Sequence, residues 1–88
     1  MAEVTVEFYG IPRRRAGRAQ LTVDADTAVA ALAQVAAACP ELGGVVAPDG
    51  RLAPLYLLSV DGKRFVADLA EPLPPGTRLL LLSADAGG

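Results

Sequence analysis

The chain has 88 residues, enough for one small domain, because two independent cores of half that length would each be too small to fold unaided. Its 52% hydrophobic and 20% charged residues are typical of a globular protein and argue against a wholly disordered chain. The net charge of −2 disfavours general binding to nucleic acid or to anionic membranes. Because the sequence has no histidine, it lacks the usual general base and metal ligand, which excludes most hydrolase mechanisms.

Cysteine content and the N-terminal sequence predict a cellular location. The single cysteine, Cys39, allows no internal disulfide and no Cys-X-X-Cys pair for zinc or redox exchange, so a reducing compartment is expected. The N-terminus has no basic start or apolar core of a signal peptide, and no apolar run approaches the roughly 18 residues of a membrane span. We therefore expect a cytoplasmic protein. Asp24, Asp26 and Asp49 have no convergent partners, so no metal site is expected.

Alternation of apolar and polar residues predicts two strands at the start of the chain, over residues 4–9 and 19–24. Gly10 and Pro12 end the first strand, since both residues are typical of turns. The pattern therefore predicts a hairpin whose loop spans residues 11–18. This loop is basic, with arginines at Arg13, Arg14, Arg15 and Arg18.

A helix is predicted after Thr27, in the alanine-rich part of the chain. Asp26 and Thr27 are short polar residues that can accept hydrogen bonds from the first free amides of a helix, and Pro40 ends the run. The apolar residues at steps of three or four, expected on the buried face, are Val29, Leu32, Ala36 and Cys39. Cys39 is therefore interpreted as a core residue and not as a reactive thiol.

The second half of the chain predicts three more strands. Residues 55–60 are almost continuously apolar, Asp61-Gly62 is a strong tight-turn pair, and residues 63–66 form the return strand of a hairpin. Residues 67–76 contain too much proline for a regular element. Residues 78–83 are apolar on both faces, as expected of a central strand.

The predicted order of elements is strand, strand, helix, strand, strand, strand, which indicates an α+β domain. A mixed sheet of four to five strands with one main helix and the last strand in the middle is the layout of the β-grasp fold. One helix covers only one face of a sheet, so the other face would carry an exposed apolar patch unless a fifth strand or a loop folds back over it. The residues concerned are Tyr9 and either Leu79 with Leu81 or Leu80 with Leu82.

The C-terminal residues complete a pattern that belongs to a known family. Residues 1–83 would form the β-grasp domain, and residues 84–88 read as a flexible tail of small residues that ends in Gly-Gly. Over essentially its whole length the sequence resembles the ubiquitin-like sulfur carriers, namely the small subunit of molybdopterin synthase and the thiamine sulfur carrier. The stretches that carry the resemblance are VTVEFYG, DTAVAALAQVAAACPEL, VDGKRF and, most specifically, EPLPPGTRLLLLSADAGG.

The resemblance implies a function based on the C-terminal carboxylate. In this family an E1-like activating enzyme uses ATP to adenylate the terminal glycine, here Gly88, and sulfur then replaces the adenylate to leave a thiocarboxylate. Asp85, Ala86 and Gly87 would be the tail that enters the partner's catalytic pocket. The chain itself would be a protein co-substrate, with no enzymatic activity and no bound cofactor.

The resemblance also implies a docking patch on the uncovered sheet face. The matching positions are Tyr9, Leu80 and Leu82, which would leave Leu79 and Leu81 in the core. A further patch position falls near Arg64 or Phe65, and the alignment leaves this choice open. The implied partners are the adenylating enzyme and either the large subunit of molybdopterin synthase or thiazole synthase.

Three functional hypotheses stay open. The first is a sulfur carrier, with molybdopterin synthesis favoured over thiamine synthesis by the length of the chain. The second is a ubiquitin-like modifier that becomes attached to lysines of other proteins. The third is a plain β-grasp binding module in which Gly87-Gly88 is incidental. Two departures from the family leave the identity of the partner open: the tail has no prolines, and the 11–18 loop is more basic. The arginines of this loop are either simply solvated or complementary to an acidic activating enzyme.

Overall fold

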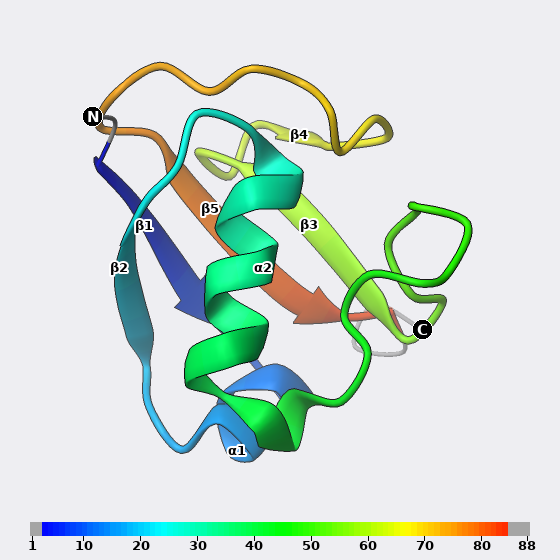
Figure 1. Cartoon of the computed structure of the whole chain (residues 1–88). Helices are drawn as coiled ribbons and strands as arrows, with labels where there is room; N and C mark the ends of the chain where they lie inside the picture. Colours follow the sequence, from blue (N-terminus) through cyan, green and yellow to red (C-terminus); the bar gives the residue numbers. More distant parts are fainter. Residues whose placement is uncertain (1–2, 85–88) are drawn as a thin grey trace.

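The computed structural model describes residues 3–84, in which one main helix packs on one face of a five-stranded mixed sheet (Figure 1). This arrangement confirms the predicted α+β class. The elements in chain order are β1 (Glu3–Phe8), α1 (Ile11–Ala16), β2 (Gln20–Asp24), α2 (Ala28–Ala38), the short 3₁₀ helix η1 (Pro40–Leu42), β3 (Tyr56–Val60), β4 (Arg64–Phe65) and β5 (Arg78–Ser83).

The sheet has the strand order β2-β1-β5-β3-β4, so the last strand lies in the middle, as predicted. β5 runs parallel to β1 and antiparallel to β3, and the remaining neighbours are antiparallel. Because parallel strands end at the same edge of a sheet, β1 and β5 both end near α1 (Figure 1). This edge is called the exit edge below, since the chain leaves β5 there.

The face of the sheet toward α2 is the core. Leu79 and Leu81 of β5 are 0% exposed, which confirms their predicted place in the interior. They pair in register with Val6 and Phe8 of β1, so branched and aromatic side chains of neighbouring strands contact each other under the helix. Cys39 is also buried, as expected of a core thiol.

Helix α2 begins where the sequence predicts, and its buried face matches the prediction only in part. Thr27 is its N-cap, and its Oγ1 accepts a hydrogen bond from the Ala30 amide at 3.2 Å. The predicted buried face is wrong at Val29, whose side chain is 37% exposed. Leu32 and Cys39 are buried as predicted, and the helical residues that are buried in addition are Ala28, Ala31 and Val35. Alanines on this face let the helix backbone approach the sheet closely, and the apolar residues on every side of the helix made its rotation ambiguous.

The predicted 11–18 loop is also wrong, because residues Ile11–Ala16 form the short helix α1. Gly10, with φ of 64°, turns the chain out of β1, and Pro12 lies in the first helical turn, where its missing amide costs nothing. Gly17, with φ of 73°, ends the helix in the left-handed conformation, and its amide donates to the Arg13 carbonyl at 3.0 Å. The prediction took Gly10 and Pro12 as the boundaries of a loop, whereas here they begin a helix.

The β3–β4 hairpin forms as predicted. Residues 61–63 connect the paired Val60 and Arg64, and Asp61 and Gly62 have the positive φ values, 55° and 71°, of a tight hairpin turn that the Lys63 amide closes by donating to the Val60 carbonyl at 3.0 Å. Asp61 also joins the turn to β5, because its Oδ1 accepts from the Arg78 amide at 3.0 Å. The proline-rich segment that follows has no long regular element, and it buries Leu69 and Leu73 beside the start of α2.

Candidate functional site

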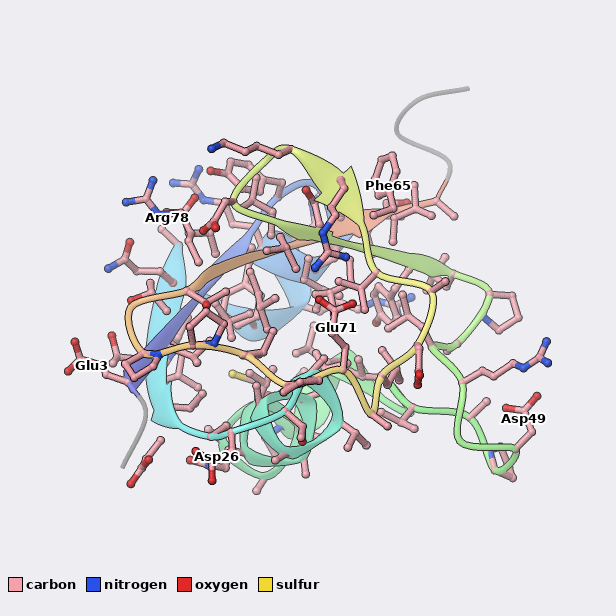
Figure 2. All side chains as sticks on the ribbon, turned by 90° about the horizontal axis from the view of Figure 1, so that it is seen from above. Glu3, Asp26, Asp49, Phe65, Glu71 and Arg78 are labelled. Carbon is pink, nitrogen blue, oxygen red and sulfur yellow. The ribbon has the colours of Figure 1, made fainter. Side chains whose placement is uncertain are left out.

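The sheet face opposite α2 carries an apolar cluster. Residues that pair directly across strands share a face, so the pairs Leu57–Leu82 and Ser59–Leu80 both lie on this side of β3 and β5. Phe65 pairs with Ser59 and joins them at the edge strand, on the side of the sheet away from α2 (Figure 2). Together with Tyr9, these side chains form what is called the open-face patch: Tyr9, Leu57, Phe65, Leu80 and Leu82.

Exposure of the open-face patch is high for apolar side chains. Phe65 is 63% exposed, Tyr9 41% and Leu57 36%, while Leu80 and Leu82 are half-buried between neighbouring strands. β4 extends the sheet at its edge and does not fold back over this face, so the fifth strand leaves the patch accessible. An apolar cluster of this kind on a small domain is typical of an interaction site.

The structure brings together the three predicted patch residues and adds two. Tyr9, Leu80 and Leu82 lie on one face, and of the two candidates on the second hairpin Phe65 shares that face whereas Arg64 points to the opposite side. Sequence analysis missed Leu57, because Leu57 and Leu58 are both apolar and the pattern alone does not show which of them faces outward. The pairing register supplies that information.

A polar network holds the phenol of Tyr9 at the edge of the patch. Its hydroxyl donates to Glu7 Oε1 at 2.5 Å, and the other oxygen of Glu7 lies 2.9 Å from Arg78 Nε. The hydrogen bond to Glu7, with smaller contributions from desolvation and from the carboxylate charge, raises the pKa of the Tyr9 phenol above its usual value. Tyr9 therefore stays neutral at physiological pH and presents its ring in a restrained position.

The predicted reacting residue Gly88 and the tail residues Asp85, Ala86 and Gly87 lie outside the described residues. The structure does place the start of the tail. β5 ends at Ser83, and the Ala84 amide donates to the Leu55 carbonyl at 2.7 Å beside the start of β3. The chain thus leaves the central strand at the exit edge, directly after patch residue Leu82.

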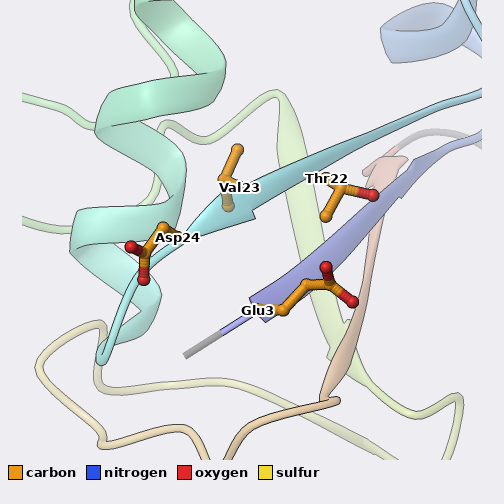
Figure 3. A pocket seen from close by; sticks show the side chains of 4 residues that line it. All are labelled: Glu3, Thr22, Val23 and Asp24. Atoms are coloured by element: carbon orange, nitrogen blue, oxygen red, sulfur yellow. The ribbon is translucent and has the colours of Figure 1, made fainter. Parts of the chain in front are cut away.

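Shallow depressions also occur elsewhere on the described surface. The one in Figure 3 has a volume of about 340 Å³ and lies at the opposite end of β1 from Tyr9. Its lining residues, two of them carboxylates, are Glu3, Thr22, Val23 and Asp24, and none of these four is basic. Within residues 3–84, no three acidic or cysteine side chains are grouped to hold a metal ion. In the same part of the chain, no helix is long and apolar enough to span a membrane.

The sequence matches no protein-family model and no curated protein, but solved structures resemble it closely. SAMP1, the small archaeal modifier protein 1 of Haloferax volcanii, is 26% identical with a TM-score of 0.82, over 99% of this chain and 100% of its own. The Methanosarcina acetivorans protein of the same name is 21% identical with a TM-score of 0.82, over 100% of this chain and 98% of its own.

A Pyrococcus furiosus protein named for molybdopterin converting factor, subunit 1, is 15% identical with a TM-score of 0.70 and covers 94% of this chain and 98% of its own. At that identity the likeness, like that of the Methanosarcina protein, concerns the fold. The sheet order, the single main helix and these structural relatives show that the chain has the β-grasp fold of ubiquitin-like proteins.

Proposed function

We propose that this protein is a sulfur carrier whose Gly88 carboxylate is adenylated and then converted to a thiocarboxylate. In the first step a Gly88 oxygen bonds to the α-phosphorus of ATP and pyrophosphate leaves. In the second step hydrosulfide from a sulfur donor attacks the carbonyl carbon, a C–S bond forms, and AMP leaves with the oxygen. A carboxylate is a poor electrophile until it is activated in this way. The adenylating enzyme supplies the ATP site and the catalysis, and this chain supplies the acyl group.

One geometric observation carries the proposal: two residues of the open-face patch belong to the strand that leads to Gly87-Gly88. Leu80 and Leu82 belong to β5, and Gly88 follows Ser83, the last residue of that strand, by five residues. A chain of that length reaches at most about 17 Å. An enzyme that binds the patch can therefore receive Gly88 in a nearby catalytic pocket, and glycines without Cβ atoms suit a narrow entrance.

The test is intact-mass spectrometry after incubation of the protein, ending at Gly88, with ATP, a sulfide source and the adenylating enzyme of the same organism. We expect a mass gain equal to the difference between sulfur and oxygen. Deletion of Gly87-Gly88 is the control: a carrier loses the mass gain, whereas a plain binding module keeps its partner binding. A wild-type mass that stays unchanged, with an enzyme that modifies another carrier, would contradict sulfur transfer.

Patch variants test the docking part of the proposal. Leu57→Ser should slow adenylation of Gly88 because it removes an apolar contact from the open-face patch. Val29→Ser is the matched control, since Val29 is equally exposed, at 37% against 36% for Leu57, but lies on the outer side of α2. Equal rates for the two variants would show that the activating enzyme does not use this face.

For the receiving pathway we propose molybdopterin synthesis, with this chain as the small subunit of molybdopterin synthase. The supporting feature is the long segment 43–54, since thiamine carriers tend to be shorter. A pull-down with the large synthase subunit and with thiazole synthase separates the two pathways. Binding to thiazole synthase alone would overturn this assignment and leave sulfur transfer intact.

A second candidate function is protein modification, which is favoured by the likeness to a protein named as a small archaeal modifier. Here the same activated Gly88 carbonyl is attacked by a lysine amine, an amide bond forms and AMP leaves. Immunoblots of lysate would then show larger adducts that resist thiols, because an isopeptide bond is not cleaved by them. The absence of such adducts under conditions that produce the thiocarboxylate would remove this candidate.

A further inference from the structure

The arginines of α1 and of the turn after it concentrate positive charge on one part of the molecule. They are called the arginine surface and comprise Arg13, Arg14, Arg15 and Arg18, half of the eight basic residues of the chain. No acidic residue occurs between Glu7 and Asp24. Since the whole chain has a net charge of −2, the removal of these four charges leaves −6 on the rest, so the molecule has a strong charge asymmetry.

These guanidinium groups do not neutralise carboxylates of the described chain. Its two ion pairs join Arg64 to Glu71 and Arg78 to Glu7, and neither involves α1. Arg15 instead donates from Nη1 to the Tyr56 hydroxyl at 3.3 Å. The four side chains are exposed, and neighbouring like charges repel each other, which costs stability until a partner of opposite charge binds them.

The fold fixes the position of the arginine surface. Pro12 is the buried residue of α1, and Gly10 and Gly17 lie at the two ends of this helix. The Tyr56 hydroxyl that accepts from Arg15 donates in turn to the Leu42 carbonyl at 2.5 Å, which joins α1 to η1 and β3. Three of the arginines therefore lie on a short, anchored helix, and Arg18 lies in the turn directly after it.

The arginine surface is continuous with the open-face patch. Tyr9 of the patch is followed directly by Gly10 and α1, and Tyr9 and Arg13 line the same shallow depression of about 210 Å³. A Cβ at Gly10 would lie 4.0 Å from the Cβ of Ser83, so α1 begins beside the last residue of β5. A partner that covers the patch and receives the chain from the exit edge thus meets the arginines at its border.

We propose that the arginine surface is a second contact region of the docking interface and binds a cluster of Asp or Glu side chains on the adenylating enzyme, an inference that rests on the proposed function. The positive charge of the guanidinium groups attracts carboxylates before contact and thereby steers an acidic surface toward this part of the molecule. A nucleic acid fits less well, because tight binding takes many phosphate contacts, and the remaining surface with its charge of −6 repels a polyanion. Charges at the border of an interface act mainly on the association rate.

The test is the association rate of the protein with the adenylating enzyme, measured by stopped-flow fluorescence at several salt concentrations. Arg14→Glu should lower the rate constant about three- to tenfold at low salt and should weaken its salt dependence, with little effect on dissociation. Arg51→Glu is the matched control, because it reverses the charge of an exposed arginine in the 47–52 loop and gives the same net charge. Arg14→Lys keeps the charge and should retain most of the rate.

The outcomes separate this inference from the proposed function. A wild-type protein that neither binds the enzyme nor is adenylated overturns both. A wild-type protein that is adenylated, with equal association rates for Arg14→Glu and Arg51→Glu, overturns the arginine surface alone. Fluorescence anisotropy with a single-stranded RNA oligonucleotide tests nucleic-acid binding. If the wild-type protein binds the RNA at physiological salt and Arg14→Glu abolishes this binding, the arginine surface is a nucleic-acid site and the proposed contact with the adenylating enzyme is wrong.

Discussion

The two faces of the sheet use the same strands in different ways. On the side toward α2, Leu79 and Leu81 are 0% exposed and pack in the core, whereas Leu80 and Leu82 on the other side are only half-buried. All four are leucines of one strand, so residue type does not separate the two roles. Folding needs only the covered face, and an apolar residue on the open face adds little to stability while it lowers solubility. The composition of the open face is therefore better explained by a partner than by the core.

The largest expected difference between the faces is in stability. Leu81→Ala should lower the free energy of unfolding by about 2–5 kcal/mol, because it removes buried methyl groups and leaves a cavity under α2. Leu82→Ala, one residue further along β5, should cost about 1 kcal/mol or less, since its side chain already meets solvent. Urea denaturation of the two variants measures the contrast. Equal losses would show that both faces of β5 contribute to the core.

Much of the covered face could be predicted from sequence because local chemistry determines it. Strand β5 follows from a continuous apolar run. The N-cap at Thr27 follows from a short polar side chain, and the Asp61-Gly62 turn follows from a pair that tolerates positive φ. The rotation of α2 did not follow, because a helix with apolar residues on all sides is oriented by its contacts with the sheet. The helix α1 was missed because it is too short to show a period.

The candidate site was predictable only in part, for a related reason. Alternation in β5 leaves two choices of outward residues, and the family resemblance, not the pattern, selected Leu80 and Leu82. Leu57 and Phe65 reach the patch through the pairing of β3 with β5 and with β4, and cross-strand register is a non-local property. The position of the arginine surface beside the exit edge likewise depends on the parallel pairing of β1 with β5.

A smaller loss of stability is expected when the buried hydroxyl of Tyr56, on the covered side of β3, is removed. Tyr56→Phe removes the hydrogen bond to the Leu42 carbonyl and the acceptor for Arg15, with almost no change in volume. A buried carbonyl left without a partner should cost about 1–3 kcal/mol of unfolding free energy. Thermal and urea denaturation measure it. Stability equal to that of the wild type would mean that water replaces the hydroxyl.

On the open face, we expect substitutions to affect partner binding more than stability. Phe65→Ser should change the unfolding free energy by only about 0.5 kcal/mol, because its ring is mostly exposed. The same change should weaken binding to the adenylating enzyme about tenfold or more, since exposed aromatic residues dominate interfaces. Isothermal titration calorimetry measures the affinity, with Val29→Ser as the control. A large loss of stability with unchanged affinity would reverse the roles of the two faces.

The smallest expected effect on stability concerns Arg64, the neighbour of Phe65, which lies on the opposite face of β4. Arg64 pairs with Glu71, and its hydrogen bond and charge hold the pKa of that carboxyl below its usual 4.5. A carboxyl whose pKa is lower in the folded state contributes stability above its unfolded pKa and loses it as the pH falls through the folded value. The unfolding free energy should therefore decrease in acid, and Glu71→Gln should make this decrease shallower.

The difference between wild type and Glu71→Gln should be slight because both side chains of the pair meet solvent, and urea denaturation near neutral pH and at about pH 3 measures it. Identical acid dependence in wild type and Glu71→Gln would show that the pair forms no stabilising contact between β4 and the segment that follows it.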